Sequence, residues 1–446
     1  MQTRKDLYQA HKLMTQRVAL ALLQGKPGAA ESPLRRTGVG ALCGVMVVVL
    51  VAAGFGITGL LFKGGARNLE QPGLVLIEKE TGAAYSYSAQ QKRLIPFLNY
   101  TSARLAMSGT SIQRKLVSSR SLAKYPRGPL TGIPGAPESL PTVVRAPWSL
   151  CVSNGVSLIG GRDVGGTPLT DTQAVLVRGG PQSWLIWRNT RMRLSPAAAR
   201  TLTPAPPTPV DERWLNGLPQ GPDYAAPTIP NIGALATGPG GQTASVGQIY
   251  KVRAVAGSAE RWYVQLPDGL SGISETQAGL LLANATAQEQ VITPGAAAAS
   301  TSSTNLYNRS LPESPPRPAA YDPAAPLCAV YPDRSTSARF TVGGSLPAAA
   351  PTSNGLDQVI LPGGGTFAGT LTAPGRAPQS FSLLTEQGLR HPVPTPDDAT
   401  KLGYTQDSAA PIPANLLQLF RPGPALTSTA AARPVPATQP LTYSTP

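Results

Sequence analysis

The longest run of hydrophobic residues lies near the N-terminus. From Thr37 to Phe62 the chain has no charged residue, and the core of this run reads VGALCGVMVVVLVAAGFGITGLLF. At about 1.5 Å per residue, that core forms roughly 36 Å of helix, which is long enough to cross a bilayer. A cleaved signal peptide has a shorter apolar core and a clear small-residue cleavage site after it. We therefore predict one retained transmembrane helix at residues 37–62.

A weaker pattern precedes this run and predicts an amphipathic helix from about residue 4 to residue 23. Its apolar positions recur every three to four residues, and they include Leu7, Ala10, Met14, Val18, Ala21 and Leu22. Lys12 and Arg17 lie elsewhere on the helical wheel. The helix either rests on anionic lipid headgroups or docks its apolar stripe on another protein. We favour docking, through Leu7, Met14, Val18 and Leu22.

The flanking charges predict the orientation of the transmembrane helix. Residues 1–36 contain seven basic and two acidic residues, and Arg35 and Arg36 directly precede the apolar run. The positive-inside rule then places the N-terminus in the cytoplasm and the rest of the chain outside it. Within the helix, Gly40 and Gly44 form a G-x-x-x-G pair, a spacing that allows another helix to approach closely. Glycine is also common in spanning helices that pack against nothing.

Beyond the transmembrane run, four stretches share one order of elements, which is an extended apolar run, a turn, a second short run and an Ala/Leu-rich helix. They are residues 74–107, 174–202, 249–283 and 381–404. Pro-x-Gly-Pro follows the first two, at 126–129 and 219–222, and Pro-Gly-Pro stands at 422–424. Proline fixes φ and glycine permits positive φ, so we predict rigid turns between units. Chance similarity of Pro-rich loops is the alternative for the two weaker stretches.

These patterns predict an α+β protein with a single transmembrane helix and a large periplasmic domain. That domain would have a β-rich central core and about four βα-type repeat modules, since 41% apolar residues with 47 Pro and 46 Gly indicate a folded, turn-rich chain. The predicted segments are 1–36 (cytoplasmic helix and linker), 37–62 (transmembrane helix), 63–135 (module 1), 136–170 (first part of the core), 171–235 (module 2), 245–285 (module 3), 286–380 (second part of the core), 381–426 (module 4) and 427–446 (Pro-rich flexible tail).

The three cysteines separate into one membrane thiol and two exported ones. Cys43 lies inside the apolar run, whereas Cys151 and Cys328 lie in the two predicted core segments. An oxidising compartment favours pairing of two exported thiols, so we expect a disulfide bond between Cys151 and Cys328. Two buried free thiols are the alternative.

A search for chemistry finds no catalytic, cofactor-binding or metal-binding residues to assign. The phosphate loop G-x-x-x-x-G-K-[ST] is absent, and the glycine-rich stretch at 237–243 has no Lys. His391 is the one exported histidine, and no G-x-S-x-G elbow accompanies it. Asp397 and Asp398 follow Pro-Thr-Pro, a position typical of helix capping. The net charge of +15 is +5 in residues 1–36 and spread thereafter, with no nucleic-acid-binding motif.

With this topology, the chain resembles the EccB family of type VII (ESX) secretion systems of mycobacteria and related actinobacteria. The resemblance rests on TRKDLYQAHKLMTQRVALALLQ at residues 3–24, on Pro33-Leu34-Arg35-Arg36, on the anchor, and on NYTSARLA at residues 99–106. It continues to about residue 426, and is weaker between residues 285 and 380.

The resemblance implies a structural subunit of a protein-export channel in the inner membrane. Its implied partners are EccC, the motor ATPase, with EccD and EccE, the mycosin protease MycP on the periplasmic side, the lipid bilayer and further copies of itself. Cys151 and Cys328 match the family's disulfide. Some family members are described as ATPases, which the missing phosphate loop puts in doubt here. A periplasmic nucleotide hydrolase and a cell-wall binding module are the alternative functions.

Overall fold

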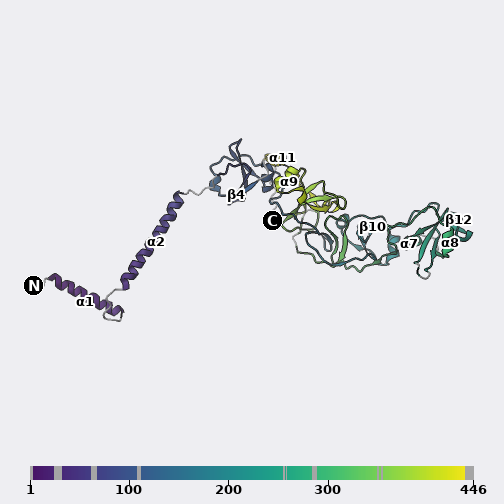
Figure 1. The fold of residues 1–446 in the computed structure, drawn as a ribbon, viewed down its shortest axis with the longest axis horizontal. Helices are drawn as coiled ribbons and strands as arrows, with labels where there is room; N and C mark the ends of the chain where they lie inside the picture. Colours follow the sequence, from purple (N-terminus) through teal and green to yellow (C-terminus); the bar gives the residue numbers. More distant parts are fainter. Residues whose placement is uncertain are drawn as a thin grey trace. The chain divides into compact units, whose positions relative to one another are not determined.

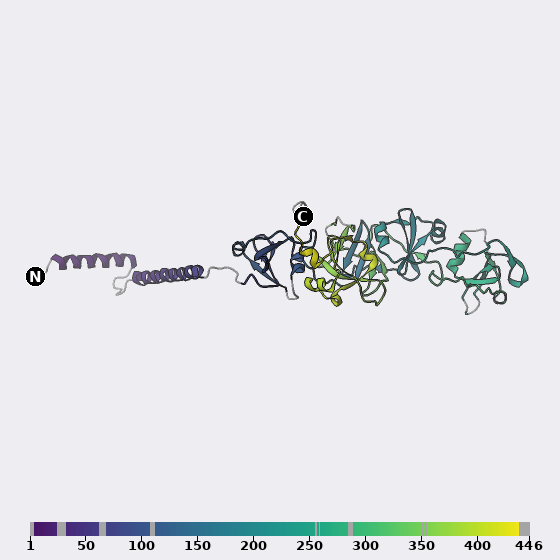
Figure 2. The same ribbon diagram turned by 90° about the horizontal axis from the view of Figure 1, so that it is seen from above.

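The computed structural model describes residues 4–24, 33–61, 68–107, 112–254, 257, 259–283, 289–348, 351–352 and 355–436. The chain forms two compact units, Met1–Arg67 and Asn68–Pro446 (Figures 1 and 2). The predicted mixed α and β class is confirmed, since long helices form the first unit and strands dominate the second.

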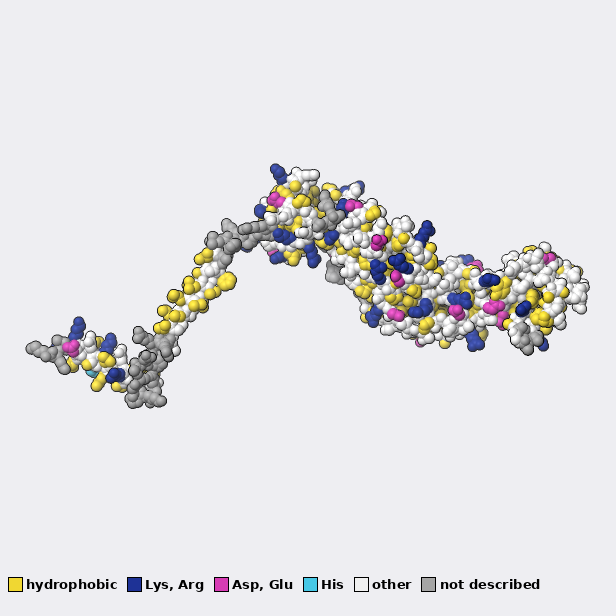
Figure 3. Space-filling model, in the orientation of Figure 1, with side chains coloured by type: hydrophobic (Ala, Val, Ile, Leu, Met, Phe, Trp, Pro, Cys, Tyr) yellow, Lys and Arg dark blue, Asp and Glu magenta, His cyan; other side chains and the backbone are white. Residues whose placement is uncertain are grey.

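Two helices form the described part of the first unit. Helix α1 spans Arg4–Gln24, within a residue of the predicted ends. Helix α2 spans Pro33–Leu61, and its stretch Thr37–Ile57 has a mean hydropathy of 2.5, long and apolar enough to cross a membrane. Figure 3 shows hydrophobic side chains along its length. Phe62, the last residue of the predicted span, lies outside the described residues, as do residues 1–3 and 25–32 of the predicted cytoplasmic segment.

The second unit begins with module 1, a four-stranded sheet in the order β3-β2-β1-β4. Strand β2 (Ala84–Ser88) lies between β1 (Leu74–Glu78) and β3 (Arg93–Phe97) and runs antiparallel to both. Helix α3 (Tyr100–Ala106) then returns the chain, so that β4 (Gln113–Val117) pairs in parallel with β1. Helix α4 (Ser119–Leu122) follows. The order is therefore β-β-β-α-β.

The same β-β-β-α-β order recurs three more times, with the fourth strand always parallel to the first. Module 2 contains β8 (Gln173–Gly179), β9 (Gln182–Trp187), β10 (Thr190–Leu194), α5 (Pro196–Leu202) and β11 (Thr208–Pro209). Module 3 contains β14 (Ile249–Val252), β15 (Arg261–Leu266), β16 (Gly269–Ile273), α7 (Glu275–Ala283) and β17 (Glu289–Val291). Module 4 contains β22 (Gly365–Leu371), β23 (Phe381–Thr385), β24 (Leu389–Pro392), α9 (Pro396–Leu402) and β25 (Ala410–Pro413).

In every module, a short segment from later in the chain pairs in parallel with the third strand, at the edge of the sheet. In each, one backbone N–H of the segment donates to a carbonyl of the third strand. The pairs are Gly128 to Leu94, Gly221 to Arg191, Ser302 to Leu270 and Gly423 to Arg390, at 2.7 to 2.9 Å. The Pro-x-Gly-Pro elements are therefore more than turns between units. Module 3 has the same segment without their sequence, so hydrogen bonding rather than proline defines it.

Three of these edge segments place a glycine against a side chain of the third strand. A Cβ on Gly128 would come within 2.7 Å of Ile95, one on Gly221 within 2.8 Å of Thr190, and one on Gly423 within 2.6 Å of His391. Real Cβ atoms do not approach so closely, so a side chain at Gly221 or Gly423 displaces the strand or the segment, whereas at Gly128 the flexible end of the Ile95 side chain has to move.

The central core is a six-stranded sheet in the order β21-β6-β5-β19-β20-β7. Strands β5 (Trp148–Val152), β6 (Val156–Gly160) and β7 (Thr167–Pro168) come from the first predicted core segment. Strands β19 (Leu327–Tyr331), β20 (Arg339–Val342) and β21 (Gln358–Ile360) come from the second. Distant segments thus interleave in one sheet, and β5 pairs with β19 at its centre.

Modules 2 and 4 contribute side chains to the hydrophobic core under this sheet. Trp148 of β5 and Trp214 of helix α6 (Glu212–Asn216) are both fully buried there, as are Leu416 and Phe420 from the end of module 4. The two indole N–H groups donate to Pro411 O at 3.2 Å and to Leu150 O at 3.0 Å. Burying a large apolar side chain contributes about 1.5–3 kcal/mol, so this junction holds the modules to the core.

Two predicted segments need correction. The second core segment is shorter than 286–380, because β17 completes the sheet of module 3 and β22 is the first strand of module 4. The flexible tail predicted from residue 427 is wrong for residues 427–436. There Thr427 caps helix α11 (Ser428–Ala431), Ala431 is fully buried, and α11 packs on α3, because small Ala side chains let the two helices approach. Residues 437–446 lie outside the described residues.

Candidate docking surfaces

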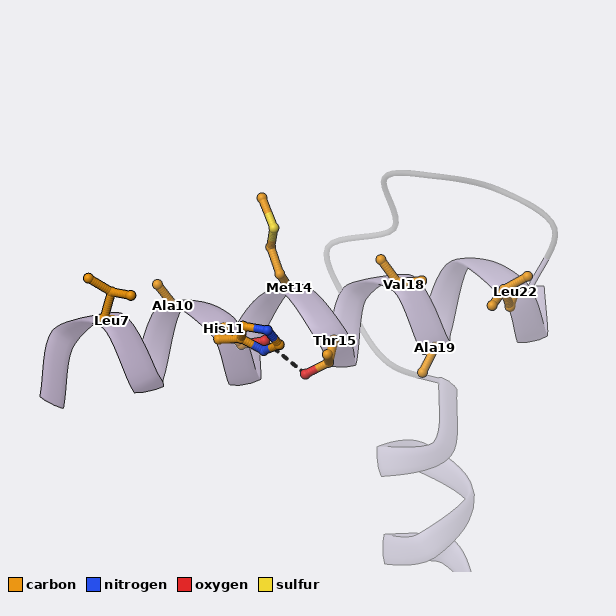
Figure 4. Close-up of a pocket in the computed structure, with 8 residues that line it drawn as sticks. All are labelled: Leu7, Ala10, His11, Met14, Thr15, Val18, Ala19 and Leu22. Carbon is orange, nitrogen blue, oxygen red and sulfur yellow. Dashed lines mark hydrogen bonds between the residues drawn. The ribbon is translucent and has the colours of Figure 1, made fainter. Parts of the chain in front are cut away.

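The apolar face of α1 is the first candidate docking surface. Leu7, Met14, Val18 and Leu22 are 58% to 82% exposed, and they lie near one another because residues four and seven apart share a helix face. Figure 4 shows Leu7, Ala10, Met14 and Val18 pointing to the same side of the helix. Moving each of these apolar side chains out of water lowers the free energy of the system. The face is therefore suited to contact with another apolar surface.

Polar residues border this face on one side. His11 and Thr15 lie beside Met14, and the Thr15 hydroxyl donates to the His11 carbonyl at 2.8 Å (Figure 4). Because that bond satisfies the hydroxyl within the helix, Thr15 presents mainly its methyl group to a partner. A shallow hollow runs along this face of α1, and neither Lys12 nor Arg17 lines it. Its lining residues are Leu7, Ala10, His11, Met14, Thr15, Val18, Ala19 and Leu22.

The glycine pair of α2 is the second candidate surface. A Cβ on Gly40 or on Gly44 would meet nothing within 4 Å, so the backbone is open along this side of the helix. The two glycines lie one turn apart, and their missing side chains leave a shallow hollow that a neighbouring helix can occupy. Packing at Gly40 and Gly44 stays a prediction.

Cys151 and Cys328 lie opposite each other in the central strand pair of the core and form a disulfide bond. Both are fully buried, in a cluster with Ile159, Val164 and Val330. The bond therefore joins the two core segments, which are 177 residues apart in the sequence, away from solvent. Cys43, in α2, is free and exposed.

The residues considered for catalysis have structural contacts. His391 is buried, its Nδ1 lies 3.2 Å from Pro424 O, and burial lowers its pKa, so the imidazole is neutral and closed to a substrate. Asp398 lies in the first turn of α9, where it accepts from the backbone N–H and the hydroxyl of Ser428. Those hydrogen bonds, with one from Thr395, outweigh desolvation and lower the Asp398 pKa. Among the described residues, no three His, Cys, Asp or Glu side chains are grouped as metal ligands.

The glycine-rich stretch at 237–243 forms the tip of a hairpin. Strands β12 (Leu235–Thr237) and β13 (Thr243–Ser245) pair through a short turn at Pro239–Gly241. Gly238 N–H donates to Gln242 O at 2.7 Å, so it is used within the turn itself. This geometry is that of a β-turn rather than of a phosphate-binding loop at a helix N-terminus.

The distribution of positive charge differs from the prediction. Residues 63–135 contain eleven basic and three acidic residues, a net charge of +8, whereas residues 136–446 contain twenty and eighteen, a net charge of +2. Figure 3 shows several Lys and Arg side chains on the surface of module 1, which carries the label β4 in the same view of Figure 1. The charge beyond residue 36 is therefore concentrated in module 1 and the residues before it. A charge count by segment would have detected this concentration.

Comparison with known proteins identifies the family. The family model described as "Type VII secretion system ESX-1, transport TM domain B" matches residues 1–436, which include both helices of the first unit and all four modules. This chain belongs to the EccB family of type VII secretion proteins.

Relatives of the EccB family match over most of their length. "ESX-3 secretion system ATPase EccB3" of Mycolicibacterium smegmatis is 30% identical, over 88% of this chain and 83% of the relative. "ESX-2 secretion system ATPase EccB2" of Mycobacterium tuberculosis is 31% identical, over 86% of each. "ESX-1 secretion system ATPase EccB1" of Mycolicibacterium smegmatis is 26% identical, over 94% of this chain and 92% of the relative.

Solved structures share the fold. A chain of an intact ESX-5 inner membrane complex aligns with a TM-score of 0.66 at 24% identity, over 98% of this chain and 96% of that one. The EccB3 dimer of an ESX-3 core complex aligns with a TM-score of 0.63 at 26% identity, over 80% of this chain and 99% of that one. The first alignment covers nearly the whole chain, so the shared fold extends beyond the part that the second alignment covers.

Proposed function

We propose that this EccB chain is a structural subunit of a type VII secretion complex in the inner membrane, assembled through α1 and α2 with EccC, EccD and EccE. The observation that carries the proposal is the match of one secretion family over residues 1–436, which includes α1 and its exposed apolar face. The N-terminus lies in the cytoplasm and the second unit on the periplasmic side, as the charges before α2 favour.

Self-association through the second unit and contact with the mycosin protease MycP belong to the same proposal. The structure of a related protein is that of an EccB3 dimer, and related chains are parts of ESX-5 inner membrane complexes. The disulfide between Cys151 and Cys328 supports this role, because a platform outside the cytoplasm needs a core that resists unfolding.

A matched pair of variants tests docking through α1. Met14→Glu with Val18→Glu places two carboxylates on the apolar face, whereas Gln9→Glu with Gln16→Glu places two on the opposite face of the same helix. After gentle solubilisation and affinity purification, we expect EccC, EccD and EccE to be lost from the first variant and retained by the second. Equal recovery of these partners with both variants would contradict docking.

A second pair tests packing of α2. Gly40→Ile with Gly44→Ile fills the open side of the helix, and Ala53→Ile adds the same side chain to the opposite side. We expect the glycine variant to insert normally and to assemble poorly. Native-like assembly of the glycine variant would show that this side packs against no helix.

Nucleotide hydrolysis is the alternative, because the names of the relatives contain the word ATPase. The sequence has no phosphate loop, and the glycine-rich stretch forms a hairpin tip. Phosphate release by the purified full chain, compared with the chain carrying Lys→Ala substitutions at its exposed lysines, decides this question. Release above that control would favour an enzyme.

A further inference from the structure

One end of the module 1 sheet receives the chain from α2. Because β1 and β4 are parallel, their first residues Leu74 and Gln113 lie at the same end. Strand β2 runs the other way, so its last residue Ser88 and the turn to β3 lie at this end too. The segment that arrives from α2 enters the module here, where Leu69 is already buried.

This end carries four exposed basic side chains, Lys92, Arg93, Arg114 and Lys124, which we call the basic end. Lys92 comes from the turn before β3, Arg93 is the first residue of β3, and Arg114 lies at the start of β4. Lys124 joins them because the edge segment pairs with the start of β3, where Leu94 N–H donates to Pro126 O at 2.8 Å. Three separate parts of the chain are thus brought together by the register of the sheet.

Two tyrosines lie among these cations. The rings of Tyr87 and Tyr125 meet edge to face at 5.5 Å, and the ammonium group of Lys124 lies 4.9 Å from the centre of the Tyr125 ring. Tyrosine is enriched where protein meets the headgroup layer of a membrane, because its ring is apolar and its hydroxyl is polar.

The described acidic residues of module 1 form no ion pair with the basic end, and only Glu70, which is hydrogen-bonded to Tyr125, lies at this end and offsets part of its charge. Glu78 is buried and accepts from Thr81 and Tyr85, with Arg127 at 3.9 Å. Glu80 accepts from Ser119 N–H at 3.0 Å, and Glu70 accepts from the Tyr125 hydroxyl at 3.0 Å. Within the described ranges, no carboxylate forms an ion pair with the four side chains of the basic end.

The covalent link to α2 limits the distance between the end of α2 and the start of module 1. Eight Cα–Cα steps separate Leu61, the last residue of α2, from Leu69, and they span at most about 28 Å. From this connection and from the charge of the end, we propose that the basic end docks on anionic lipid headgroups of the membrane that α2 spans. The interaction is electrostatic, so it depends on anionic lipid and weakens as salt screens it.

Fluorescence energy transfer in bilayer nanodiscs tests this docking with the full chain. A donor dye is attached at Gln90→Cys, in the exposed turn beside Lys92, in a Cys43→Ala background, and the acceptor is a headgroup-labelled lipid. We expect higher transfer in bilayers with about 30% phosphatidylglycerol than in pure phosphatidylcholine. We expect that gain to be lost in about 0.5 M salt.

Charge reversal supplies the matched comparison. Lys92→Glu, Arg93→Glu and Lys124→Glu together should abolish the gain, while Arg261→Glu, Arg309→Glu and Arg376→Glu, at three exposed sites outside module 1, should keep it. Equal transfer in the two bilayers, or equal loss in both triple variants, would overturn the proposal. If the first triple variant does not fold, docking is tested by titrating salt against the labelled chain that keeps its four basic side chains. Energy transfer that does not change with salt would then refute docking.

Discussion

Arg213 and Asp357 are 144 residues apart in the sequence, yet Nη2 of Arg213 lies 2.8 Å from Oδ2 of Asp357. The same guanidinium lies 2.6 Å from Asp211, and Oδ2 of Asp357 also accepts from Val156 N–H at 2.7 Å. One arginine therefore joins the α6 end of module 2 to a loop and a strand of the core. Its hydrogen bonds lower the pKa of Asp211.

Replacing Arg213 by Met should lower the free energy of unfolding of the second unit by about 1–2 kcal/mol, because two charge-assisted contacts are lost while solvent still screens the pair. Arg188→Met is the control, since its ion pair with Asp171 is more exposed and longer, at 3.5 Å. Denaturant unfolding measures both. The Arg213 contribution should be complete above the ordinary Asp pKa of about 4 and be lost as pH falls from there through the lowered pKa of Asp211, because the unfolded chain then binds a proton that the folded chain does not. Equal effects of the two substitutions would refute a joining role.

Removing the disulfide with Cys151→Ala and Cys328→Ala should destabilise the second unit by about 2–5 kcal/mol, because the unfolded chain is no longer constrained. Membrane insertion should be unaffected, since both cysteines lie in the folded unit beyond α2. Thermal unfolding of the purified chain measures the effect, and Cys43→Ala, which removes the free thiol, should leave it unchanged. An unchanged midpoint in the double variant would show that the core does not depend on the bond.

Stability should fall as pH is lowered through about 6.5, the ordinary histidine pKa. Burial lowers the pKa of His391, so below pH 6.5 the unfolded chain binds a proton that the folded chain does not, and protons favour unfolding. His391→Phe keeps a ring in this position and should remove that part of the pH dependence. Denaturant unfolding of the second unit between pH 7 and pH 5 measures the difference.

Glu138 also makes stability depend on pH, and its contribution must be separated from that of His391. Glu138 is exposed, but desolvation by the residues around it raises its pKa, so the folded chain holds its proton to higher pH than the unfolded chain, and its contribution to stability is lost as pH rises. The sign is opposite to that of His391, and Glu138→Gln removes it. A His391→Phe profile parallel to the native one, in the Glu138→Gln background, would contradict the assignment to His391.

Gly423→Ala should destabilise module 4 by about 1–3 kcal/mol, because the added methyl group would lie 2.6 Å from the buried His391 ring. Gly272→Ala, in strand β16 of module 3, is the control, since a methyl group there meets nothing within 4 Å. Equilibrium unfolding compares the two. If Gly423→Ala were as stable as the control, the edge segment would be free to shift.

Local patterns were enough to predict the helices of the first unit. The apolar run and the three-to-four-residue spacing each lie within one element, so α1 and α2 could be located to within a few residues. The hairpin-and-helix order of the modules is also local. The apolar face of α1 follows from the same spacing, although its partner does not.

Pairing between distant segments could not be predicted in the same way. Strand β22, GTFAGTL, is rich in Gly and Thr, and it was missed because its strand state depends on pairing with β23 and β25. Helix α11 is four residues long, too short for any periodicity, and it exists through its packing on α3. The basic end likewise depends on register, which brings Arg93, Arg114 and Lys124 to one end of a sheet.

The interleaved core sheet also imposes an order of events during synthesis. Strand β5 can pair with β6 at once, but its other neighbour β19 and the partner thiol of Cys151 arrive only after some 170 further residues. The hydrogen bond from the Trp148 indole to the Pro411 carbonyl can form only later still, once module 4 has been made. The sheets of modules 1 and 3 are closed by pairings within about 60 residues and need no such delay, although helix α3 of module 1 still lacks its neighbour α11. An EccB chain that is cut short before module 4 would therefore contain finished sheets around a core that cannot close.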